Sequence, residues 1–172
     1  MSRRRKLPPD IRAILRMLSY ARPHGSRVDR SFRRRFLAHI PGAYVDAYAN
    51  IHVSRGTDPR VLFSSHTDTV HRQQGRQRLE YHAPTGMVCL PDKSPSSCLG
   101  ADDTIGVWLM TELIAANVPG HYVFHYGEES GGIGSSALAR AIPETLADFD
   151  LAIALDRQGI GDVITHQITG RT

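Results

Sequence analysis

The chain has 172 residues, of which 41% are hydrophobic and 22% are charged, and it contains two cysteines. This composition excludes a wholly disordered protein, and the length fits one domain that buries roughly 70% of the surface exposed by its unfolded form. Two cysteines are too few for a disulfide scaffold, so we expect a cytoplasmic location. Cys89 and Cys98 are close enough in sequence to pair, but we expect both to be free thiols. The longest apolar stretch, 105–118, is too short to cross a bilayer, so no membrane partner is expected.

The net charge of +4 combines two parts of opposite sign. Residues 1–36 hold 12 Lys/Arg against two Asp, a net of +10, whereas residues 37–172 hold 9 Lys/Arg against 15 Asp/Glu, a net of −6. The clusters at 3–6 and 33–35 fit either a surface that binds phosphates or a solvated tail followed by polar helix faces. We favour the second interpretation, because no basic run is interleaved with several aromatic residues that could stack on bases.

The first half of the chain predicts two helices followed by strands. Pro8-Pro9-Asp10 is typical of a helix start, and the apolar residues behind it fall on one helical face that should dock on a sheet. Pro and Gly then mark the ends of elements. The expected elements are a helix from Asp10 to the turn at 22–25, a helix over 29–40, strands over 43–53 and 60–65, and a hairpin over 78–90 that turns at 83–86.

The second half alternates helix and strand more regularly. We expect helices over 104–116 and 133–141, and strands over 121–126, 151–155 and 163–168. Strands separated by helices imply right-handed crossovers, and hence a three-layer α/β fold with a largely parallel or mixed sheet and helices on both faces. Residues 1–10 then form a basic tail, and residues 11–172 form a single domain.

Polar residues follow several of the predicted strands or begin a helix. In an α/β sheet, ligands bind beyond the carboxyl ends of the strands, so these residues should meet at one edge. Each has an ordinary explanation taken alone, such as a helix cap or an acidic turn. Their joint occurrence in order indicates a site. The segments are His66-Thr67-Asp68, Asp102-Asp103, Glu128-Glu129 and Asp156.

Imidazole nitrogen and carboxylate oxygen are ligands that zinc accepts, and two zinc ions about 3.5–4 Å apart can share a bridging carboxylate. Such a pair lowers the pKa of a bound water and polarises a carbonyl oxygen. A carboxylate that is not a ligand can then move the proton from that water to the leaving nitrogen. The residue types therefore suit metal-assisted hydrolysis of an amide bond.

Four segments, VLFSSHTDTV, CLGADDTIGVWLM, FHYGEESGGIGSSAL and LAIALDRQG, resemble the co-catalytic zinc metallopeptidases in order and spacing. That group includes peptidase T, the aminoacylases and carboxypeptidase G, with the zinc aminopeptidases as relatives. The resemblance covers about residues 43–156. It implies a zinc-aminopeptidase-like fold, two zinc ions, and a peptide or an N-acylated amino acid as substrate.

The resemblance also implies a role for each residue. Asp68 and Glu128 would be the catalytic residues, because Asp68 would orient the histidine and Glu128 would be the general base. An aspartate at 156 favours aminopeptidase-like or dipeptidase-like chemistry. The implied metal ligands are His66 and Asp156 on the first zinc, Glu129 on the second zinc, and Asp102 bridging both.

The chain departs from the family pattern at two places. Many members carry a lysine where this chain has Thr104. The family also takes a final zinc ligand from a histidine near its C-terminus, whereas His166, which we expect to be structural, is the one histidine downstream of Asp156. A C-terminal truncation would explain this difference. The alternatives are an inactive relative that uses the fold for binding or assembly, and a nucleic-acid-associated protein that uses the arginine-rich N-terminus.

Two further histidines lie inside the matching region. His71 follows the first motif closely enough to contact substrate, and His125 alternates within a predicted strand, where we expect it to be packed.

Overall fold

The structure is a computed structural model that describes residues 7–167 and 170–171. Its first half contains two short helices and most of the strands, and its second half alternates helix and strand as expected. The elements are α1 (Pro9–Leu18), β1 (Tyr20–Ala21), α2 (Arg27–Phe36), β2 (Tyr44–Val45), β3 (Ile51–Arg55), β4 (Val61–His66), β5 (Gly75–Arg76), β6 (Glu80–His82), β7 (Met87–Cys89), α3 (Ala101–Ala115), β8 (Gly120–His125), the 3-10 helix η1 (Glu128–Ser130), α4 (Ile133–Ala141), α5 (Pro143–Ala147), β9 (Leu151–Ala154), β10 (His166–Gln167) and β11 (Gly170–Arg171).

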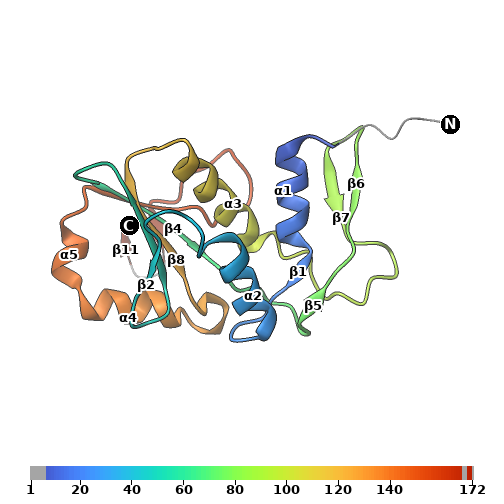
Figure 1. Ribbon diagram of the computed structural model, residues 1–172, viewed down its shortest axis with the longest axis horizontal. Coiled ribbons are helices and arrows are strands. Elements are labelled where there is room, and N and C mark those ends of the chain that lie inside the picture. The colour runs from blue at the N-terminus through green and yellow to red at the C-terminus, as the bar shows by residue number, and fades with distance from the viewer. Residues whose placement is uncertain (1–6, 168–169, 172) are drawn as a thin grey trace.

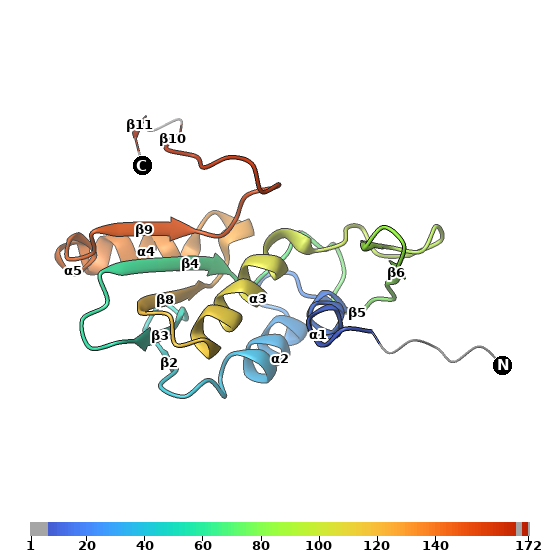
Figure 2. The same cartoon turned by 90° about the horizontal axis from the view of Figure 1, so that it is seen from above.

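The central sheet has the strand order β2-β3-β8-β4-β9 and is mixed. Strand β4 runs parallel to β8 and to β9, while β3 is antiparallel to β2 and β8. The chain leaves β4 through α3 to reach β8 on one side, and returns through α4 and α5 to β9 on the other side. Because right-handed crossovers in opposite directions put their helices on opposite faces, α3 and α4 lie on opposite sides of the sheet (Figures 1 and 2). The expected three-layer α/β fold is confirmed.

The main core lies between the sheet and helices α2 and α3. Ile51 pairs with Phe124, and Val53 pairs with Tyr122, so alternate residues of β3 and β8 present one apolar face. Phe32 of α2 packs against this face and is fully buried. The α3 residues in the same core are Val107, Met110 and Ile114.

Helix α3 approaches the end of β9 so closely that only a glycine fits at the contact. A Cβ atom on Gly106 would overlap the Asp103 carboxylate and the carbonyl oxygen of Leu155. The start of α3 is therefore held directly beside the carboxyl end of β9.

Local patterns located most elements, and the differences have physical causes. The helix at 133–141 and the hairpin with its turn at 83–86 are confirmed. The strand expected over 43–53 is divided, because Asp46 Oδ1 accepts hydrogen bonds from the backbone N–H groups of Tyr48 and Asn50 and closes a turn there.

The second helix begins and ends earlier than the expected span of 29–40. Ser26 caps its N-terminus by accepting a hydrogen bond from the Asp29 N–H at 3.0 Å, and α2 ends at Phe36. The expected strand over 163–168 begins only at His166, and Ile168 lies outside the described residues.

The arginines near the N-terminus do not form one exposed surface. Arg33 is buried, donates a hydrogen bond to the Ala49 carbonyl and lies over the Tyr126 ring, so its assignment to a polar helix face was wrong. Arg34 and Arg35 are exposed, and residues 3–6 lie outside the described part of the chain. Both cysteines are free thiols. Among the described residues, no helix is long and apolar enough to cross a membrane.

Candidate metal and active site

The strand order reverses at β4, and the side chains singled out by the motifs meet at the carboxyl end of this strand. His66 ends β4, and its Nε2 lies 2.9 Å from Asp102 Oδ1 at the start of α3. The same Nε2 lies 3.7 Å from Asp156 Oδ2 beyond β9 and 3.9 Å from Glu128 Oε2 in η1. Side chains from three other segments of the sequence thus converge on this histidine.

Two overlapping groups at this edge have donor atoms close enough to hold a metal ion. The donor atoms of His66, Asp102 and Asp156 all lie within 4.8 Å of one another, as do those of His66, Glu128 and Glu129. Glu129 Oε1 is buried and has no hydrogen-bond partner in the described structure. A buried carboxylate oxygen without a partner is costly, and a cation would satisfy it. The donor set therefore fits zinc, which binds imidazole and carboxylate together.

The site concentrates negative charge in partly buried surroundings. Burial, reinforced by nearby carboxylates, raises the pKa values of Glu129 and Asp156. Burial alone would lower the pKa of His66, but the surrounding aspartates, including Asp68 and Asp103, outweigh it and raise this pKa to about 9. A bound dication would offset the same repulsion between carboxylates.

Asp68 connects the two motifs that carry His66 and the paired glutamates. Its carboxylate is fully buried and accepts hydrogen bonds from the backbone N–H of Glu128 at 3.0 Å and of Glu129 at 3.1 Å. Burial would raise the pKa of Asp68, but the neighbouring His66 imidazole and hydrogen bonds from the backbone hold it below its usual value. Asp68 thus fixes the start of η1 against the end of β4.

Two groups of Asp68, its backbone carbonyl and its carboxylate, orient the His66 ring. Nδ1 donates to the Asp68 carbonyl oxygen at 3.1 Å and lies 3.6 Å from Asp68 Oδ1, so the backbone oxygen is the closer partner. With Nδ1 held in this way, Nε2 faces the carboxylates of the site, which is the orientation that a metal ligand needs.

Asp103 is a site residue to which the sequence assigned no role. Its Oδ2 accepts a hydrogen bond from the His66 N–H at 3.1 Å, and its Oδ1 accepts one from the Gly106 N–H at 2.9 Å. Burial raises the pKa of Asp103 to about 7. Asp102 thus faces the other carboxylates, whereas Asp103 attaches the start of α3 to β4. The resemblance gave Asp102 a role at the metals, but the adjacency of the two acids did not reveal that Asp103 holds the backbone of His66.

Arg22 also supports the site and was missed. Its side chain is fully buried, stacks on the Phe32 ring at 4.0 Å and donates from Nε to the Thr67 carbonyl. The Arg22 N–H donates to Thr69 Oγ1, and the Arg22 carbonyl accepts a hydrogen bond from the Thr69 N–H. Burial lowers the pKa of Arg22 to about 10. The only signal in the sequence was an arginine beside the apolar end of a helix.

The remaining predicted histidines occupy different surroundings. His71 is buried and bonded to Thr69 and Gln77 rather than open to the site. His125 Nδ1 lies 3.3 Å from Asn50 Oδ1, on the half-buried end of β8. His166 lies in β10. Thr104, at the position where many of the metallopeptidases that the sequence resembles have lysine, is buried and donates to the Gly100 carbonyl.

Comparison with solved structures shows that several peptidases share this fold. A tripeptidase from Staphylococcus aureus is 23% identical, with a TM-score of 0.64 over 87% of this chain and 43% of its own. The aminopeptidase PepT from Bacillus cereus is 20% identical, with a TM-score of 0.63 and the same two coverages. The dipeptidase Dug1p from Saccharomyces cerevisiae is 15% identical, with a TM-score of 0.59 over 92% of this chain and 40% of its own.

The chain thus spans less than half the length of these three proteins. No protein-family model matches it, and no curated protein sequence matches it. The resemblance inferred from the four sequence segments is confirmed as a likeness of fold.

Proposed function

We propose that this protein hydrolyses an amide bond in a peptide or an N-acylated amino acid with the help of two zinc ions. The observation that carries the proposal is the convergence of His66 with the carboxylates of Asp102, Glu128, Glu129 and Asp156 at the carboxyl end of β4. The tripeptidase, aminopeptidase and dipeptidase structures that share the fold support a peptide as the substrate class.

Each donor has a distinct role in the proposal. His66 and Asp156 would hold the first zinc, Glu129 would hold the second, and Asp102 would bridge both. When bound, zinc polarises the amide carbonyl and lowers the pKa of a coordinated water.

Glu128 is the general base in this proposal. Its side chain is 45% exposed, so it can reach both the substrate and solvent, and its Oε2 lies 3.9 Å from His66 Nε2. Glu128 would accept the proton of the attacking water and pass it to the leaving nitrogen. Asp68 would act as a positioning residue, because its carboxylate holds the backbone N–H groups of both glutamates.

A pair of matched variants tests these roles. In a preparation that hydrolyses dipeptides, Glu128→Gln should keep its zinc content and lower turnover by roughly 10²–10⁴-fold, the usual contribution of general acid–base catalysis. Glu129→Gln has the same change in charge and shape one residue further along, and it should weaken the second zinc. Near-normal turnover in Glu128→Gln, or zinc loss in that variant alone, would contradict the assignment.

A further inference from the structure

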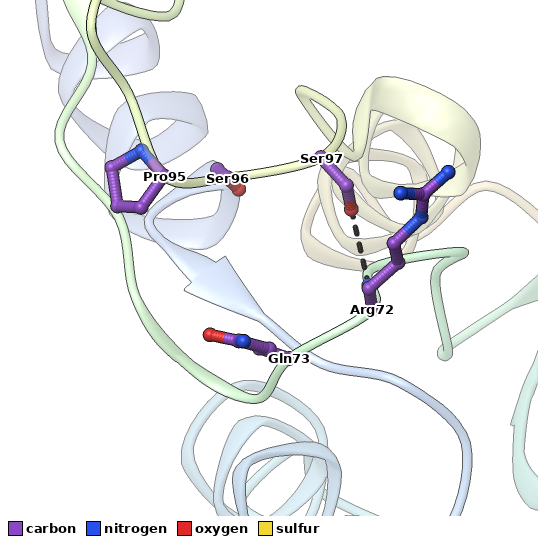
Figure 3. A pocket seen from close by; sticks show the side chains of 5 residues that line it. All are labelled: Arg72, Gln73, Pro95, Ser96 and Ser97. Atoms are coloured by element: carbon purple, nitrogen blue, oxygen red, sulfur yellow. Dashed lines mark hydrogen bonds between the residues drawn. The ribbon is translucent and has the colours of Figure 1, made fainter.

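A groove with several positively charged lining residues lies between segments 72–80 and 91–97. It consists of a pocket of about 690 Å³ and one of about 300 Å³ that share Gln73, Pro95 and Ser96 as lining residues. Figure 3 shows the smaller pocket, with Gln73 on one segment opposite Pro95 and Ser96 on the other. A hydrogen bond of 3.1 Å from the Arg72 N–H to Ser97 Oγ joins the two segments.

The charge on this groove differs from that of the acidic remainder of the chain. Four cations line it, namely Arg72, Arg76, Arg78 and Lys93, against the single carboxylate of Glu80. Within the described residues, none of the four cations forms an ion pair. Their positive charge is therefore available to a ligand.

Arg76 is held in place by Tyr20. Its guanidinium lies 3.8 Å from the centre of the Tyr20 ring, and its backbone pairs with the same residue in the β1–β5 ladder. An arginine held in this way loses less conformational entropy when it binds a carboxylate.

One lining residue of the groove, Gln77, is connected to the proposed active site by hydrogen bonds. Gln77 donates to the carbonyls of Leu18 and Leu99 at 2.7 and 2.8 Å, and its Oε1 accepts from His71 Nε2 at 3.1 Å. His71 Nδ1 in turn accepts from Thr69 Oγ1 at 2.7 Å, and Thr69 directly follows Asp68. The groove and the loop that carries Asp68 are thus parts of one fixed network.

We propose that this groove binds the side-chain carboxylates of an acidic peptide and so selects acidic substrates. The choice of a peptide rests on the proposed function, while the choice of an anion rests on the four unpaired cations. The pocket volumes suit a ligand of a few residues. Tyr20 lies under Arg76 and no aromatic side chain lines either pocket, so the groove lacks a surface on which nucleic-acid bases could stack.

The test is a binding titration on the chain kept free of metal with a chelator. The probes are triglutamate with an amidated C-terminus and trialanine amide, which match in length and differ in side-chain charge. The chain should bind triglutamate amide at least tenfold more tightly than trialanine amide, and added salt should weaken this binding.

Matched variants separate the groove from the overall charge of the chain. Arg78→Gln with Lys93→Gln should weaken triglutamate amide binding at least tenfold. Arg34→Gln with Arg140→Gln removes the same charge from exposed positions on α2 and α4 and should change binding less than twofold.

Three results would overturn the proposal: equal losses in the two double variants, equal binding of the two peptides, or tighter binding of a hexathymidylate oligonucleotide than of triglutamate amide. Because the titration needs neither zinc nor turnover, its failure would leave the hydrolase proposal intact. Conversely, a chain without zinc or turnover could still pass this test.

Discussion

Replacing Asp68 by asparagine should destabilise the chain strongly, although the two side chains have nearly the same shape. The Asp68 carboxylate is fully buried, and each of its oxygens accepts a hydrogen bond from the backbone N–H of Glu128 or Glu129. Asparagine keeps one acceptor oxygen and presents an NH₂ group to the other N–H. A hydrogen bond to a charged group contributes about 1.5–3 kcal/mol, and a buried donor left without a partner costs about 1–3 kcal/mol. We therefore expect the free energy of unfolding to fall by about 3–5 kcal/mol.

Urea denaturation of the metal-free chain at neutral pH measures this change. Asp58→Asn is the matched control, because Asp58 is exposed and should change the free energy of unfolding by no more than about 0.5 kcal/mol. If Asp68→Asn unfolds at the same urea concentration as the control, Asp68 does not hold η1 against β4, and the reasoning is wrong.

Two further predictions concern packing and protonation. Gly106→Ala should lower the free energy of unfolding by about 1–3 kcal/mol, because a Cβ there overlaps neighbouring atoms; Gly161→Ala, which meets nothing within 4 Å, is the denaturation control. Burial lowers the pKa of His121 from 6.5 to about 4, and the charge of His52 contributes to the same shift. The unfolded chain therefore protonates His121 at a higher pH than the folded chain does. Stability should therefore fall as the pH drops from about 6.5 towards 4, and His121→Gln should flatten a urea series over that range; an unchanged slope would contradict this assignment.

The sequence predicted those helices and strands that are long enough for their apolar residues to show a regular repeat. Helix α4 was expected at its observed bounds, because its apolar positions and flanking glycines are local signals. Strands β1 and β5 have two residues each and pair across more than 50 positions, so no periodic pattern marked them. The division of the strand at 43–53 depended on one side chain, Asp46, which closes a turn onto its own backbone.

The sequence predicted which residues meet at the site, but not the hydrogen bonds that hold them in place. Because ligands bind at the carboxyl ends of parallel strands, the positions of His66 and Asp156 after two predicted strands were enough to place both at the same edge of the sheet. The contacts of Arg22 with Thr67 and of Asp103 with the His66 backbone depend on how distant segments pack. Spacing alone carries no information about such contacts.

The zinc content of the chain tests the central claim most directly. After dialysis against trace zinc, elemental analysis should find at least one equivalent in the wild type. The same content is expected in a His39→Ala, Asp148→Ala control, which removes the same residue types from exposed positions. His66→Ala with Asp156→Ala should lose that zinc while remaining folded by circular dichroism. Equal zinc in the folded double variant and the control would show that the carboxyl end of β4 is not the metal site.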